Sequence, residues 1–122
     1  MNNASIDKNH SSTMLMSSSQ ERWTKLVSQT YFPLTLNYGN PEARFQGSLK
    51  VWKAQGSDFS LSRLWSYQAE YSRCQSQIAQ DDHASFLVTI PLRTHVFFTQ
   101  HGRSLNCPPG HFIVEQGDAP YR

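Results

Sequence analysis

The histidines are the first residues to test for chemistry, because imidazole nitrogens bind metals and carry protons. The chain has five of them, and a zinc or iron site needs three or four converging nitrogen, sulfur or carboxylate ligands. No His-x-His pair occurs, His95 and His101 are too far apart on one strand to share an ion, and His10 and His111 stand alone. The spacing therefore predicts surface or hydrogen-bonded histidines and no metal.

Nucleophilic and acid–base catalysis are also disfavoured. Neither Ser85 nor Cys107 lies in a nucleophile-elbow motif, and no glycine-rich phosphate loop is present. The paired carboxylates Asp81-Asp82 lie in a polar segment, where such a pair is more often solvated than catalytic. Cys74 and Cys107 are expected to be free thiols in a reducing compartment. The sequence therefore predicts no catalytic residues, no cofactor and no enzyme.

The aromatic residues, which make up 12% of the chain, favour a ligand-binding function over catalysis. Aromatic side chains on strands can line a concave interior that holds one small ligand, although packing in the core is their commoner role. Arg73 ends an aromatic-rich strand, where an inward guanidinium can hold a carboxylate through two parallel hydrogen bonds. A salt bridge from Arg73 to Asp81 or Asp82 is the alternative. The candidate ligand-binding residues are Trp52, Trp65, Tyr67, Arg73 and Phe97.

One amphipathic helix is expected to precede the strands. Ser18 and Glu21 have the spacing of a capping box, and an apolar stripe with a period of 3.6 residues follows. The helix should stop before Pro33. The stripe consists of Trp23, Leu26, Val27, Thr30 and Tyr31.

About seven short strands should follow, because the apolar period changes to two after Pro33 and turn residues recur at close intervals. Residues 45–51 alternate cleanly, and residues 86–92 form the strongest apolar segment, with Pro91 expected at a strand end. Residues 95–100 and 103–107 should form a hairpin through His101-Gly102. Many short strands predict a β-sandwich or small barrel.

Composition sets the remaining limits. The chain has 122 residues with 38% apolar and 16% charged residues and a formal net charge of +2, which suits one globular domain. Its cations are scattered rather than gathered on one helix, so direct DNA binding is not expected. No segment is long enough for a signal sequence core or a membrane span, and a cytoplasmic protein is expected. Residues 1–18, rich in Ser and Asn, are predicted to be a disordered tail, and residues 19–122 the domain.

The order of motifs resembles the N-terminal cupin-like regulatory domain of AraC/XylS-type bacterial transcription regulators. The resemblance covers residues 23–122. It begins with the Trp23 helix and Phe45-x-Gly47-x-Leu49, and continues with Leu61-Ser62-Arg63, Tyr71-Ser72-Arg73 and the strand over 86–92. It ends with Gln100-x-Gly102-Arg103, Pro109-Gly110-x-Phe112 and Pro120-Tyr121.

The resemblance implies a mainly β, cupin-like or jelly-roll barrel or sandwich that senses a small molecule, such as a carboxylate or aromatic compound, or that dimerises. In such regulators further strands and a helix-turn-helix domain follow, so the chain is expected to be an N-terminal fragment with an incomplete fold. The resemblance also implies that it regulates transcription, as an activator, through that attached domain.

Two alternatives stay open. One is a small cupin-type enzyme, a metal-dependent dioxygenase or isomerase. It is disfavoured because the late Pro-x-Gly-x-x-His motif of such enzymes would place Ile113 or Tyr121 where the histidine belongs. The other is an interaction fragment that has lost its parent function.

Overall fold

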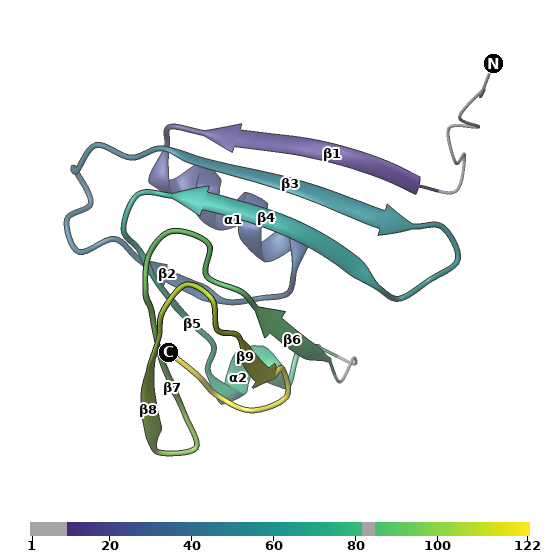
Figure 1. The fold of residues 1–122 in the computed structure, drawn as a ribbon. Helices are drawn as coiled ribbons and strands as arrows, with labels where there is room; N and C mark the ends of the chain where they lie inside the picture. The colour runs from purple at the N-terminus through teal and green to yellow at the C-terminus, as the bar shows by residue number, and fades with distance from the viewer. Residues whose placement is uncertain (1–9, 82–84) are drawn as a thin grey trace. The chain divides into compact units, whose positions relative to one another are not determined.

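The computed structural model describes residues 10–81 and 85–122 of the chain (Figure 1). The elements are mainly strands, which confirms the predicted fold class, and the four sheets that they form are not closed into a barrel. In chain order the elements are β1 (His10–Ser17), α1 (Gln20–Thr30), β2 (Thr35–Asn37), β3 (Gly47–Ala54), β4 (Ser60–Ser66), β5 (Glu70–Ser72), α2 (Gln75–Ile78), β6 (Phe86–Thr89), β7 (Val96–Gln100), β8 (Arg103–Cys107) and β9 (Ile113–Gln116).

The chain divides into two compact units. The first contains residues 1–26 and 38–68, and the second contains residues 27–37 and 69–122. The division falls inside α1, so this helix contributes its first two turns to unit 1 and its last residues to unit 2.

Unit 1 is built on a three-stranded antiparallel sheet in the order β1-β3-β4. In β3, buried and half-buried residues alternate from Gly47 to Trp52, as the alternation in the sequence predicts. Leu49 and Val51 are buried, and they share one face of the sheet with Gly47. We call this the covered face, because the ring of Trp23 in α1 packs on it at Gly47.

The contact between α1 and the covered face depends on a glycine, Gly47, which has no side chain. A Cβ atom at Gly47 would lie 2.9 Å from three carbons of the Trp23 ring, so only glycine leaves room for the indole. Trp23 is fully buried, and its ring also lies 5.9 Å from that of Phe45. The first residue of the apolar stripe therefore buries its ring against the sheet.

The start of α1 differs by one residue from the predicted capping box. Ser19, not Ser18, accepts a hydrogen bond at its Oγ from the backbone N–H of Arg22, at 3.3 Å. Ser17 fixes the preceding turn, because its hydroxyl donates to the carbonyl of Ser19 and accepts from the N–H of Ser19. The helix ends at Thr30, before Pro33, as predicted.

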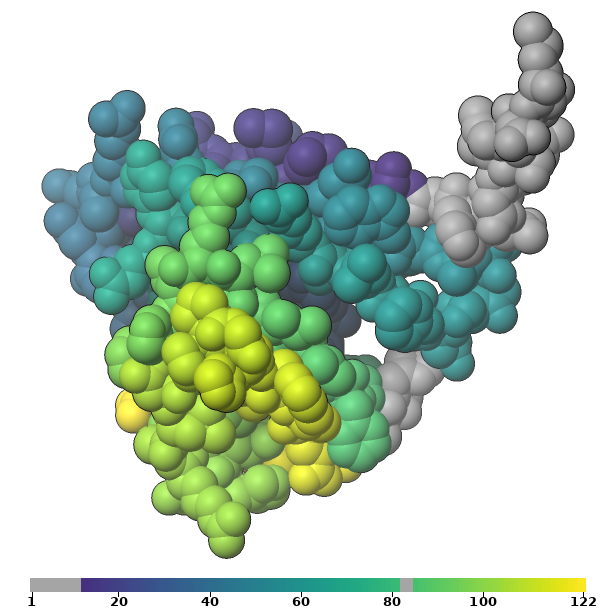
Figure 2. All heavy atoms as spheres, viewed as in Figure 1, coloured from purple at the N-terminus to yellow at the C-terminus, as the bar shows by residue number. Residues whose placement is uncertain are grey.

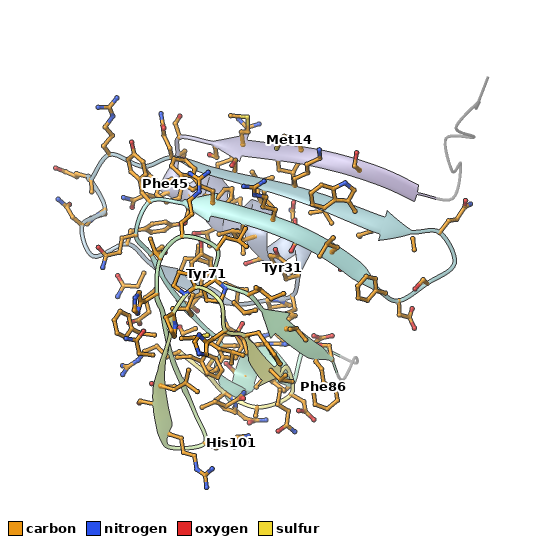
Figure 3. The ribbon with its side chains drawn as sticks, in the orientation of Figure 1. Met14, Tyr31, Phe45, Tyr71, Phe86 and His101 are labelled. Atoms are coloured by element: carbon orange, nitrogen blue, oxygen red, sulfur yellow. The ribbon has the colours of Figure 1, made fainter. Side chains whose placement is uncertain are left out.

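Unit 2 consists of three two-stranded antiparallel ladders, β2-β5, β6-β9 and β7-β8. The β7-β8 hairpin turns through His101 and Gly102, whose φ angles of 54° and 70° suit a type I′ turn. The predicted hairpin is confirmed, and in its register Gln100 pairs with Arg103 and Val96 with Cys107. Figure 3 places His101 at the tip of this hairpin. A buried cluster of Phe98, Cys107 and Ile113 packs with Val96 and Tyr121.

Two predictions about local structure need correction. The disordered tail was predicted over residues 1–18, but residues 10–17 form β1, which pairs with β3 along its whole length. Hydrogen bonds to β3 supply the stability that the polar composition of this segment does not, so residues 10–17 are an ordered strand of the sheet. Residues 1–9 of the predicted tail lie outside the described residues. The polar segment after Cys74 contains the short helix α2, which the sequence analysis did not predict.

Candidate functional site

Two of the predicted ligand-binding residues, Trp52 and Trp65, lie on the side of the unit 1 sheet opposite the covered face. The register aligns Ser48 with Trp65, Lys50 with Arg63 and Trp52 with Leu61. On the other side of β3, Ser12, Met14 and Met16 align with Trp52, Lys50 and Ser48. Directly paired residues point to the same side of an antiparallel sheet. We call this side, made of these nine residues, the open face.

The open face carries large apolar side chains that are exposed to solvent. Met14 is 58% exposed, Met16 70%, Leu61 57% and Trp65 49%. The Lys50 ammonium lies 4.9 Å from the centre of the Trp52 ring, a distance at which a cation is attracted to the ring face. Figure 2 shows atoms of β1 and β3 at the molecular surface, and Figure 3 labels Met14 on β1. In unit 1 these predicted residues therefore lie on an open sheet face and do not line a barrel interior.

Tyr67, the third predicted residue of unit 1, joins the open face to the core. Its ring lies 5.8 Å from the Trp65 ring and 6.3 Å from the Phe45 ring, both edge to face. Phe45 in turn contacts Tyr38 at 5.0 Å. Tyr67 thus links Trp65 to a series of aromatic contacts that runs through Phe45 to Trp23.

Arg73 lies in unit 2 and is buried, with a side-chain exposure of 1%. Its Nη2 donates to Asp81 Oδ2 at 2.8 Å, and its Nη1 donates to the carbonyl of Gly117 at 2.8 Å. The guanidinium carbon lies 3.9 Å from the centre of the Phe32 ring. The structure therefore contains the Asp81 salt bridge that the sequence analysis gave as the alternative to ligand binding, whereas Asp82 lies outside the described residues. Within the described part of the chain, Arg73 Nε has no hydrogen-bond partner.

Tyr121 pairs with Arg73 through the backbone. The backbones of Arg73 and Tyr121 exchange two hydrogen bonds, at 3.0 and 3.1 Å, and Tyr121 also bridges to Gln100 of β7. Burial raises the pKa of the Tyr121 phenol, the nearby Glu115 carboxylate raises it further, and Arg73 opposes both effects. The phenol is therefore a neutral hydrogen-bonding group at physiological pH.

Glu115 is the second buried ionisable residue of unit 2. Thr89 Oγ1 donates to its Oε1 at 2.9 Å. Burial raises the pKa of the Glu115 carboxyl, and the hydrogen bond from Thr89 lowers it by a smaller amount. A buried carboxylate that receives a single hydroxyl donor is destabilised in its charged form.

A depression of about 440 Å³ opens at the surface of unit 2 beside Tyr121. Small-ligand sites are commonly of this size. Its residues come from the β7-β8 turn and the end of the chain, which pair through two backbone hydrogen bonds between Thr99 and Arg122. Phe97, the fifth predicted residue, lies on β7 two positions before Thr99. It is 76% exposed and is not among the lining residues. The lining residues are Thr99, Gln100, His101, Gly102, Pro120, Tyr121 and Arg122.

The side chain of Gln100 supports this depression from within unit 2. Its amide nitrogen donates to the carbonyls of Gln116 and Ala119, and its amide oxygen accepts from the N–H of Gln116. The Gln100 amide therefore makes the backbone hydrogen bonds at the end of β9 that a neighbouring strand would otherwise make. Gln100 and Tyr121 are not among the site residues predicted from the sequence, although both belong to the motifs on which the family resemblance is based.

Two histidines and both cysteines of unit 2 lie apart from one another in hydrogen bonding: each histidine has its own partner, and neither cysteine is in a disulfide. His95 hydrogen-bonds to Asn106 and His101 to Gln116, and Cys74 and Cys107 are free thiols, as predicted. Within residues 10–81 and 85–122, no three His, Cys, Asp or Glu side chains come together in a group able to hold a metal ion. In the same part of the chain no helix is long and apolar enough to cross a membrane.

The fold and these features define a class of protein, a mainly β domain with an open depression on unit 2. The AraC-binding-like domain family matches residues 23–122. The chain belongs to this family, and it is a regulatory domain of the kind found in AraC-type regulators. No curated protein and no solved structure matches the chain.

Proposed function

We propose that this chain is the effector-sensing and dimerisation domain of an AraC-type transcription regulator, and that it controls promoter activation through an attached helix-turn-helix domain. The match to the AraC-binding-like family over residues 23–122 is the observation that carries this proposal. An attached DNA-binding domain would place the regulator in the cytoplasm. The domain itself makes no specific contact with DNA in this proposal, and it forms a homodimer.

The effector site that we propose is the depression beside Tyr121. A small molecule there would meet the Tyr121 ring, the imidazole of His101 and the cation of Arg122. A ring and a cation in one depression suit a carboxylate or an aromatic compound. Arg73 would act behind the site, because its backbone holds that of Tyr121. Phe97 would contribute an exposed ring on the same strand, two residues before Thr99.

Thermal-shift and calorimetric titrations with a panel of small carboxylates and aromatic compounds test the effector site. A ligand that raises the melting temperature of the parent chain should lose at least ten-fold in affinity in Tyr121→Leu and Arg122→Gln. The matched control is Arg93→Gln, which removes a cation outside the depression. An effector with equal affinity for all four chains would contradict the proposed site.

Two further measurements test the role of the domain. Fluorescence anisotropy with promoter DNA at physiological salt should show only weak binding that does not depend on sequence. Light scattering should show dimers at micromolar concentrations. Stoichiometric iron, zinc or manganese retained through a chelator wash would contradict the proposal and favour a cupin-type enzyme.

A further inference from the structure

The open face of unit 1 has a charge pattern that its own fold does not explain. Lys50 of β3 lies directly opposite Arg63 of β4, and like charges opposite each other destabilise a sheet. No Asp or Glu is among the nine residues of the face. Neither cation forms an ion pair in the described part of the chain. Among the residues that the structure describes, the two cations are therefore held together without an anion to neutralise them.

Apolar side chains flank these cations on both sides along the strands. One row consists of Met16, Ser48 and Trp65, the middle row of Met14, Lys50 and Arg63, and the third row of Ser12, Trp52 and Leu61. Four large apolar residues of these rows are between 49% and 70% exposed. Exposed apolar side chains gathered beside charged ones are typical of a surface that contacts a partner. The opposite face of the same sheet is already covered by Trp23 of α1.

The dimensions of the open face match those of a helix. Strand spacing and rise per residue give the nine positions a footprint of roughly 10 Å by 14 Å. An α-helix is about 10 Å wide, and successive turns are about 5.4 Å apart, close to the spacing of roughly 7 Å between rows. A helix lying along the strands would therefore place the side chains of three successive turns over the three rows.

We propose that the open face binds an acidic amphipathic helix of a partner protein. Carboxylates on the middle turn of that helix pair with Lys50 and Arg63, and apolar residues one turn before and one turn after pack on the Trp65 and Trp52 rows. This surface lies in unit 1 and is separate from the effector depression of unit 2, so it adds a partner to the proposed regulator.

The charge of unit 1 supports an acidic partner. Within residues 10–26 and 38–68 there are six Lys and Arg but only three Asp and Glu. One of these acids, Glu21, already pairs with Lys25 on α1 at 3.3 Å. The excess of cations would steer an acidic helix toward this unit during encounter. The two methionines can adjust to the apolar side chains of such a helix.

A charge-exchange experiment tests the proposal. The probe is a fluorescein-labelled synthetic helix of about 16 residues, long enough to be helical, with two glutamates flanked by leucines one turn away on each side. A second probe replaces the glutamates with lysines. Anisotropy should show that the parent chain binds the acidic probe at least ten-fold more tightly than the basic probe. The double variant Lys50→Glu with Arg63→Glu should reverse this preference.

Lys53→Glu is the matched control for Lys50→Glu, because Lys53 is an exposed lysine of the same strand whose side chain lies on the other side of the sheet. It should leave the acidic probe bound within two-fold, whereas Lys50→Glu should weaken binding at least ten-fold. Circular dichroism of each variant confirms that it is folded. Equal binding of both probes, or an equal loss in Lys53→Glu, would overturn the proposal.

A small organic anion is the competing occupant. 2-Naphthoate carries a carboxylate and an aromatic body but cannot span three rows. If 2-naphthoate binds with an affinity that depends on Lys50 and Arg63 while the acidic probe does not bind, the face is a small-molecule site and the proposed helix partner is wrong. Binding of the acidic probe that 2-naphthoate displaces only weakly supports the proposal.

Discussion

The two units of this domain are stabilised in different ways. In unit 1, Trp23 packs into the space left by Gly47, and rings extend this core through Phe45 to Tyr38 and Tyr67. In unit 2, the ladders are short, and the buried guanidinium of Arg73 and the amide of Gln100 join segments that are distant in sequence. Apolar packing is insensitive to pH and tolerates exposed charge nearby, whereas a buried polar network depends on each of its partners. The contrast predicts that the units will respond differently to substitution and to pH.

Trp23→Ala should have the largest effect and should act on unit 1. Removing a fully buried indole typically costs about 3–5 kcal/mol, a large part of the stability of a small domain. The denaturant midpoint should therefore fall sharply. Trp65→Ala is the control, because Trp65 is half-exposed and its loss should cost much less. A Trp23→Ala midpoint equal to that of the parent chain would show that the ring does not support the sheet.

Arg73→Met should be comparably severe in unit 2. Removing one partner of a buried ion pair costs about 3–5 kcal/mol, because the other charge is left without compensation. Here Asp81 and the carbonyl of Gly117 would each lose the hydrogen bond that Arg73 donates. The double variant Arg73→Met with Asp81→Leu should recover part of the loss in a double-mutant cycle of unfolding free energies. Additive losses would mean that the pair does not act as a unit.

Gly47→Ala should cost about 1–3 kcal/mol, the usual penalty for overpacking a core. The added methyl group would lie 2.9 Å from rigid ring carbons of Trp23. Thermal unfolding should show that Trp23→Phe costs less in the Gly47→Ala background than in the parent chain, because the smaller ring makes room for the methyl group. Gly56→Ala does not serve as a control, because the positive φ of Gly56 adds strain. Ser48→Ala is a suitable control, because Ser48 lies on the open face, opposite the covered face.

Glu115→Gln should reveal the pH dependence of unit 2. The native state holds the Glu115 proton more tightly than the unfolded state does, because burial raises the pKa of this carboxyl above its ordinary value of 4.5. The stability that protonation gives is present below the ordinary pKa and is lost as pH rises through the folded-state pKa. The gain in melting temperature from Glu115→Gln should therefore grow with pH across this range. A gain that is the same at every pH would exclude Glu115 as the source.

Lys50→Glu should produce the smallest change, a gain of about 0.2–1 kcal/mol, because it replaces a like-charge cross-strand pair with an opposite-charge pair. The gain should shrink in high salt, and Lys53→Glu, which faces Ser60, should not show it. Chemical denaturation at low and high salt measures both. A stabilising substitution that abolishes binding of the acidic helix would show that the fold retains Lys50 for its partner. A loss of stability in Lys50→Glu would show that Lys50 and Arg63 do not repel each other.

The local elements could be predicted from the sequence, because their causes are local. The stripe from Trp23 to Tyr31 predicted α1, alternation from Gly47 to Val51 predicted β3, and His101-Gly102 predicted the β7-β8 turn. Each depends on the period of apolar residues or on the backbone preference of one or two residues. The family resemblance, which used motifs in order, is confirmed by the match over residues 23–122.

The tertiary structure decided what depends on pairing between distant segments. β1 forms because β3 supplies its hydrogen bonds, which no property of a Ser-rich segment could indicate. Arg73 could bind a ligand or Asp81, and only the position of Asp81 at 2.8 Å shows the salt bridge. Lys50 and Arg63 are 13 positions apart, and the register of β3 with β4 alone makes them neighbours. Sequence patterns determine the faces of each element, because side-chain direction is a local property, whereas the partner of each face is determined only when strands from distant parts of the chain align.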